Sequence, residues 1–108
     1  MIYLDNAATT AVRPEVVDAM LPYYRTNYSN PSGVYGFAGK NKNVISDARD
    51  VIASVINAKG DEIYFTSGGS ESDNWALKGI AWAYRNKGRH IITTKIEHHA
   101  ILHSCEWL

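Results

Sequence analysis

The sequence predicts an α/β fold with elements in the order helix, helix, strand, helix, strand, helix. Two short apolar stretches, residues 62–66 and 90–94, are each followed by a turn and then by apolar residues at helical spacing. A single helix with short connections separates them, so we expect parallel pairing with a right-handed crossover. Strands that alternate with helices in this way are typical of α/β domains.

The first part of the chain predicts one helix and one loop. Residues 1–12 are expected to form an extended N-terminal segment. A helix should start at Pro14, because proline suits the first helical turn. Pro22 lies within the apolar stripe of that helix, so we expect it to distort or shorten the helix. Residues 27–39 contain Asn-Pro and several glycines, a composition that predicts a loop.

The rest of the chain predicts three more helices. Apolar residues recur at helical spacing between residues 44 and 56, and the Asn and Gly of residues 57–60 should end that helix. A third helix is expected over residues 70–86. The last helix should begin near His98 or His99 and contains no stop signal before the chain ends, so we expect the chain to be a piece of a longer protein.

Length and composition limit the classes of protein. With 108 residues the chain is one domain at most, and we expect residues 13–108 to be part of a single incomplete α/β domain. The formal net charge is zero, which does not favour nucleic acid or a membrane surface as a partner. No apolar run approaches the roughly 20 residues of a membrane span. One cysteine excludes an internal disulfide framework and suits a reducing cytoplasm.

The glycine-rich turn at residues 66–70, Thr-Ser-Gly-Gly-Ser, has two interpretations. Glycines let backbone N–H groups approach an anion, the following helix N-terminus carries partial positive charge, and Ser70 adds a hydroxyl donor. The alternative is an ordinary turn in which Ser70 caps the helix, with Asp73 as its partner in a variant capping box. The spacing matches neither a nucleotide P-loop nor a dinucleotide-binding fingerprint. Both interpretations stay open on the pattern alone.

The histidines at the start of the last predicted helix are a second candidate site. They follow the second predicted strand, which places them beside the first loop at the carboxyl edge of a sheet. His98 could stack on an aromatic cofactor or move protons there, whereas the structural alternative is a capped helix start with surface histidines. His99 and His103 share a helix face, but Ala100 stands where a zincin helix needs Glu, and we predict no metal site.

The other reactive side chains have weaker support. Cys105 lies among apolar residues of the last helix, which is typical of a structural thiol. Lys78 and Lys87 fall at positions expected to be solvated. Lys95 is the only lysine close to a predicted site.

Four stretches taken together resemble one family. "YLDNAATT", "NPSG", "FTSGGSESDNWALKG" and "HIITTKIEHHAIL" occur in this order and cover almost the whole chain. The sequence resembles the cysteine desulfurases of the NifS/IscS type, which are class V aminotransferase relatives. The resemblance implies the N-terminal portion of the large domain of a fold-type I transferase that depends on pyridoxal 5'-phosphate.

The resemblance also implies an activity and site residues. Members of this family take sulfur from L-cysteine, giving L-alanine and an enzyme-bound persulfide for an acceptor such as an iron–sulfur scaffold protein. Gly69 and Ser70 correspond to the residues that bind the cofactor phosphate. His98 corresponds to the histidine that stacks on the pyridine ring and moves protons. The family further implies a homodimer.

The chain departs from the family in ways that bear on activity. Family members are several times longer, and their cofactor-binding lysine and persulfide-forming cysteine lie beyond the part that this chain resembles, so we expect no activity from the chain alone. Tyr35 stands where many relatives carry histidine. The same resemblance leaves open a selenocysteine lyase or another class V aminotransferase. The residues themselves leave open a non-enzymatic module that binds an anion or a partner and self-associates.

Overall fold

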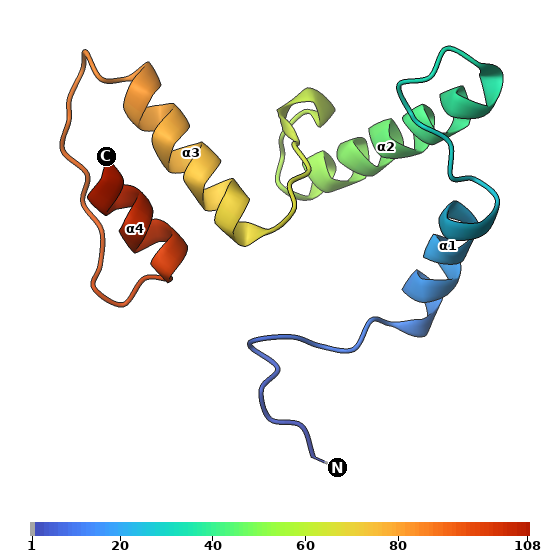
Figure 1. Ribbon diagram of the computed structural model, residues 1–108, viewed down its shortest axis with the longest axis horizontal. Helices are drawn as coiled ribbons and strands as arrows, with labels where there is room; N and C mark the ends of the chain where they lie inside the picture. Colours follow the sequence, from blue (N-terminus) through green and yellow to red (C-terminus); the bar gives the residue numbers. More distant parts are fainter. Residues whose placement is uncertain (1) are drawn as a thin grey trace. The chain divides into compact units, whose positions relative to one another are not determined.

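The computed structural model describes residues 2–108, and all the regular elements within them are helical (Figure 1). The chain divides into two compact units, one ending at Ile63 and one spanning Tyr64–Leu108, and each is described by itself. The elements of the first unit are α1 (Pro14–Arg25), α2 (Gly36–Val55) and the 3-10 helix η1 (Gly60–Glu62), and those of the second are α3 (Gly69–Ala83) and α4 (His99–Trp107).

The two predicted strands are not confirmed. Glu62 closes η1, Ile63 is extended with φ −99° and ψ 124°, and residues 90–94 lie outside helices and turns. A strand needs a neighbour that supplies ladder hydrogen bonds. No backbone hydrogen bond joins the two segments among residues 2–108, so the predicted parallel pairing between them is not confirmed either.

The N-terminal segment and α1 follow the prediction in part. Met1 lies outside the described residues, and the segment after it contains a turn in which the Ala8 N–H donates to the Asp5 carbonyl at 3.1 Å. Helix α1 starts at Pro14 as predicted, but Pro22 does not shorten it. The Pro22 carbonyl accepts from the two N–H groups that follow α1, at 2.9 and 2.8 Å, which satisfies one of the last carbonyls of the helix.

Hydrogen bonds within a buried polar cluster connect the loop before α2 to that helix. The Asn41 side chain is 8% exposed, and its Nδ2 donates to Ser29 Oγ at 2.9 Å, to the Ser29 carbonyl at 3.0 Å and to the Asn27 carbonyl at 2.5 Å. The Ser29 hydroxyl in turn donates to the Phe37 carbonyl at 3.0 Å. The loop is shorter than predicted because α2 begins at Gly36.

Helix α2 ends where the sequence predicts. Asn57 adopts φ 56°, the left-handed conformation that commonly terminates helices, and the Ala58 N–H donates to the Ala53 carbonyl at 2.9 Å. Helix η1 then packs against α2. A Cβ at Gly60 would meet the carboxylate of Asp50, so a larger residue there would require the Asp50 side chain to move.

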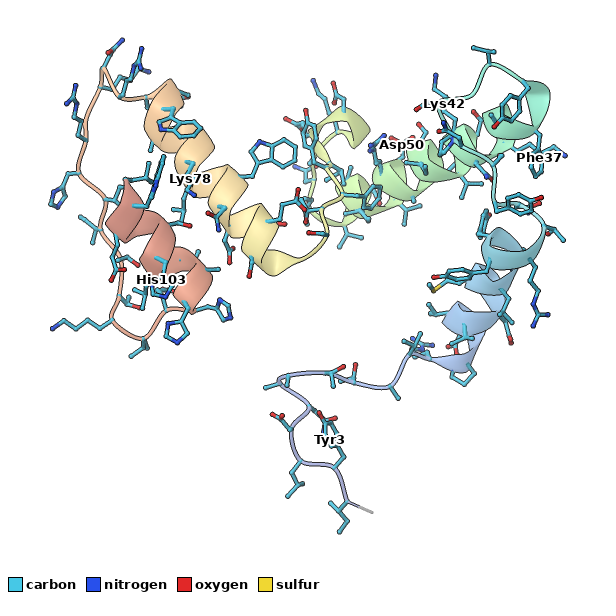
Figure 2. All side chains as sticks on the ribbon, viewed as in Figure 1. Tyr3, Phe37, Lys42, Asp50, Lys78 and His103 are labelled. Carbon is cyan, nitrogen blue, oxygen red and sulfur yellow. The ribbon has the colours of Figure 1, made fainter. Side chains whose placement is uncertain are left out.

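In the second unit α3 and α4 pack side by side and run in the same direction (Figure 1). The Trp82 and Trp107 rings meet edge to face near the C-terminal ends of the two helices, with centroids 6.0 Å apart. Lys78, labelled in Figure 2, places its Nζ 4.6 Å from the centroid of the Trp107 ring, a cation–π contact. Among residues 2–108, no helix is both long enough and apolar enough to cross a membrane.

Candidate functional site

The glycine loop before α3 is not capped by its serine. Gly68 is the N-cap of α3, its backbone is extended with φ 165° and ψ 179°, and no side chain makes a hydrogen bond as the cap. The predicted capping box of Ser70 with Asp73 is therefore wrong. The helix begins one residue earlier than expected, at Gly69, so the Ser70 hydroxyl falls inside the first turn instead of at the capping position.

A carboxylate three residues past the cap orders this loop. Glu71 Oε2 accepts from the Ser67 N–H at 2.6 Å and from the Ser67 hydroxyl at 2.7 Å. The Thr66 hydroxyl donates to the Gly68 carbonyl at 3.1 Å, and the Ser72 hydroxyl lies 2.7 Å from Thr66 Oγ1. Because the one Thr66 hydroxyl proton is used on Gly68, Ser72 is the donor in that second pair.

The backbone amides of the first turn of α3 remain available to a ligand. The first hydrogen bond of the helix runs from the Ser72 N–H to the Gly68 carbonyl at 3.2 Å, and the N–H groups of residues 68–71 donate to no residue among 2–108. A Cβ added at Gly68 or Gly69 would meet nothing within 4 Å, so the space around the loop is open. Unpaired amides at the positive end of a helix are suited to an anion, and the geometry favours the anion cradle over the capped turn.

An open groove continues from this loop along α3. This shallow surface groove has a volume of about 550 Å³, and its lining includes Ser70, Asn74 and Lys78 together with the rings of Trp75 and Trp82. The Trp75 ring is supported by an edge-to-face contact with Tyr64, with centroids 5.2 Å apart. An anion held at the helix N-terminus would therefore lie at one end of a groove with aromatic walls.

The hydrogen bonds to Glu71 change its titration. The Ser67 N–H, and after it the Ser67 hydroxyl, stabilise the ionised carboxylate and hold the pKa of Glu71 below the ordinary glutamate value of 4.5, against a small opposing effect of desolvation. Because the folded pKa is lower than the unfolded one, the stabilisation is fully present above pH 4.5 and disappears as the pH falls through the lowered pKa.

We expect the loop before α3 to stay ordered as the pH falls below the ordinary glutamate range, and to loosen only at a lower pH. The amide proton signal of Ser67, followed by NMR during acid titration, should report a midpoint below 4.5. Glu71→Gln keeps an oxygen acceptor but cannot ionise, so the same signal should lose this transition. A midpoint at or above the ordinary value would contradict the pair of hydrogen bonds to Glu71.

His98 is the N-cap of α4, so the predicted start of the last helix is confirmed. Its Nδ1 accepts from the Ala100 N–H at 3.1 Å, and the ring is exposed. The His99 and His103 rings stack with centroids 5.4 Å apart, and His103, labelled in Figure 2, has its Nδ1 3.1 Å from Glu106 Oε2. The described part of the chain contains no group of three or more His, Cys, Asp or Glu side chains arranged to hold a metal ion.

The packing of α3 on α4 brings the two predicted site segments to the same end of the second unit. The helices run in the same direction and pair at Trp82 and Trp107. His99 lies eight residues before Trp107, which corresponds to about 12 Å along the axis. Asn74 lies eight residues before Trp82 in α3. It is between one and two helical turns from Gly69, the first residue of that helix. The start of α4 therefore faces the N-terminal half of α3, and the roles of Gly69, Ser70 and His98 stay predictions.

Two further outcomes concern the sequence prediction of this site. Cys105 is a half-buried free thiol within α4, next to the buried Ser104, in agreement with a structural interpretation. The contribution of Glu71 was missed. Its signal was present, because a glutamate three residues after an N-cap can accept from backbone N–H groups at the helix start, but the cap was placed at the wrong residue.

The comparisons with known proteins identify the family of the chain. The geometry of the second unit is that of a glycine loop at a helix N-terminus, which is suited to an anion. The family model described as "Aminotransferase class-V" matches residues 2–108, and the chain belongs to this family. It is 59% identical to "Cysteine desulfurase IscS" of Methanosarcina thermophila over 99% of this chain and 26% of that protein. It is 49% identical to "Putative cysteine desulfurase IscS 1" of Bacillus subtilis, covering 99% of this chain and 28% of that protein.

Two solved structures are also similar. A "NIFS-LIKE PROTEIN" matches with a TM-score of 0.91 and 39% identity, over 98% of this chain and 29% of that one. "SspA in complex with cysteine" matches with a TM-score of 0.88 and 40% identity, over 97% of this chain and 30% of that one. The chain thus has the fold of the corresponding part of NifS-like enzymes, and it spans about a quarter of the length of the curated relatives it matches.

Proposed function

We propose that this chain forms the cofactor-phosphate loop of a cysteine desulfurase that depends on pyridoxal 5'-phosphate. The observation that carries the proposal is the open glycine loop, whose free amides at residues 68–71 lie in a chain 59% identical to a named cysteine desulfurase. The reaction takes the sulfur atom of L-cysteine onto an enzyme thiol, which leaves L-alanine and an enzyme persulfide.

The residues present fit the cofactor. Its phosphate is an anion, and the free amides of Gly69 and Ser70, with the Ser70 hydroxyl, are donors of the kind that hold phosphate at a helix N-terminus. His98 is exposed at the start of the adjacent helix, and its Nε2 makes no hydrogen bond to any residue among 2–108. When bound, pyridoxal phosphate supplies an electron sink for bonds at the α-carbon of an amino acid.

The proposal extends to partners and location. A relative has been solved in complex with cysteine, which supports L-cysteine as the substrate here. The name IscS of the curated relatives supports an iron–sulfur scaffold as the sulfur acceptor, and a single cysteine suits a cytoplasmic setting. Among the described residues of the first unit, helix α1 packs against no other helix and exposes Val16, Val17 and Met20, which supports a homodimer or other self-association.

A chimera tests the proposed activity. Residues 2–108 would replace the corresponding quarter of the Methanosarcina thermophila relative, and alanine release from L-cysteine would be measured with pyridoxal phosphate present and absent. We expect cofactor-dependent alanine release from the chimera and none from the 108-residue chain alone. Ser70→Ala in the chimera should weaken retention of the cofactor during dialysis.

The controls separate the related chemistries. The unaltered relative, assayed in parallel, gives the reference rate, and L-selenocysteine is offered as a second substrate. A folded chimera that retains pyridoxal phosphate but releases alanine only from L-selenocysteine would replace the proposal with a selenocysteine lyase. A folded chimera that retains no cofactor would contradict the assignment of the phosphate loop.

A further inference from the structure

We propose that Glu71 is a positioning residue for the phosphate site, an inference that rests on the proposed function of the loop. Its carboxylate holds Ser67 and thereby presents the amides of residues 68–71 to the anion. The two hydrogen bonds from Ser67 to Glu71 Oε2, at 2.6 and 2.7 Å, are the observations that carry this proposal.

The donors of the loop fall into two sets. Those ahead of the helix are satisfied within the protein, since Ser67 gives its N–H and its hydroxyl to Glu71 and Thr66 gives its hydroxyl to the Gly68 carbonyl. The amides of residues 68–71 donate to no residue among 2–108. The carboxylate of Glu71 thus occupies the donors of Ser67, and the amides of residues 68–71 remain for an incoming anion.

The negative charge of Glu71 also opposes anion binding, which an uncharged side chain would not do. A carboxylate beside the anion-binding amides repels a phosphate, although solvent and salt screen that repulsion because Glu71 is exposed. The compensating gain is a loop whose backbone is ordered before the ligand arrives. A preorganised site binds more tightly because less conformational entropy is lost on binding.

Two uncharged variants isolate the hydrogen bonds from the charge. Glu71→Gln retains a side-chain oxygen that can accept from Ser67, whereas Glu71→Ala retains none, and neither carries charge. Inorganic phosphate would be titrated into each 108-residue variant near neutral pH, and affinity read from the amide chemical shifts of residues 67–71. We expect Glu71→Gln to bind phosphate at least as tightly as the wild type and about fivefold more tightly than Glu71→Ala.

Glu62 supplies a matched control. Its Oε2 accepts from the Lys59 N–H at 2.8 Å, a comparable carboxylate contact to a preceding backbone N–H at the start of η1, and it lies outside the loop before α3. Glu62→Gln and Glu62→Ala should bind phosphate with equal affinity. Equal helix content of the two Glu71 variants by circular dichroism, together with faster hydrogen exchange of the Ser67 amide in Glu71→Ala alone, would assign the effect to the loop.

The outcomes separate this inference from the proposed function. If the wild-type chain binds phosphate but the two Glu71 variants bind it equally, the positioning role is overturned and the phosphate loop stands. If the wild-type chain shows no phosphate-dependent shifts at residues 67–71, the phosphate loop itself fails and the inference fails with it. If Glu71→Ala loses α3, Ser67→Ala, which removes one of the two hydrogen bonds, decides the question by an intermediate loss of affinity.

Discussion

Replacement of Gly69 by proline is expected to weaken phosphate binding by roughly 10- to 100-fold while α3 stays helical, because one hydrogen bond to a charged group is lost. Gly69 is the first residue of α3, a position where proline is favoured, so the substitution removes an N–H without removing the helix. The extended backbone of Gly68 is compatible with a following proline, and a Cβ at position 69 meets open space.

Gly36→Pro is the matched control for this substitution. Gly36 is the first residue of α2, a Cβ there also meets nothing within 4 Å, and the preceding Tyr35 is extended. Phosphate affinity of the Gly36 variant should equal that of the wild type, while both variants keep their helix content by circular dichroism. If Gly69→Pro bound phosphate as tightly as the wild type, the amide of residue 69 would not be part of the site.

Asn41→Ala is expected to lower the free energy of unfolding of the first unit by about 1–3 kcal/mol, because it leaves buried acceptors without their donor. The Asn41 amide is the hydrogen-bond donor to Ser29 and to the Asn27 carbonyl, and it connects the loop before α2 to that helix. Asn43→Ala, on an exposed turn of the same helix, removes no such contact and should be neutral or slightly stabilising.

The tryptophans make this measurement specific to one unit. All three of them, at positions 75, 82 and 107, lie in the second unit, so tryptophan fluorescence during urea unfolding follows that unit. Far-ultraviolet circular dichroism follows the helices of both units. We expect Asn41→Ala to shift the dichroism curve to lower urea and to leave the fluorescence curve unchanged. A parallel shift of both curves would show that the two units unfold together.

The sequence predicted helices better than strands because helices depend on local contacts. Pro14 at the start of α1, Asn57 after α2 and His98 before α4 act within a few residues, and all three boundaries agree with the structure. Residues 90–94 have the apolar character of a strand, but a ladder needs a second segment from elsewhere in the sequence. Apolar spacing in one segment does not say whether such a partner is adjacent.

The candidate site was also predicted only in part from the sequence. The glycine loop was recognised from its residue types, and the structure adds free amides and open space around them. The placement of the cap at Ser70 failed because glycine can occupy an N-cap without a side-chain contact, so the hydroxyl residue was the more obvious choice. Glu71 was missed for the same reason, since its partner Ser67 lies before the helix.

The cap at α4 determines which ring nitrogen of His98 can face a ligand. Its Nδ1 lone pair accepts from the Ala100 N–H, so the neutral ring carries its hydrogen on Nε2. Toward a ligand the ring can therefore donate a hydrogen bond through Nε2. The tautomer with its hydrogen on Nδ1 would lose the contact with the Ala100 N–H, so the helix cap favours the Nε2–H form. The cap thus fixes both the orientation of the imidazole and the nitrogen that it presents to a ligand.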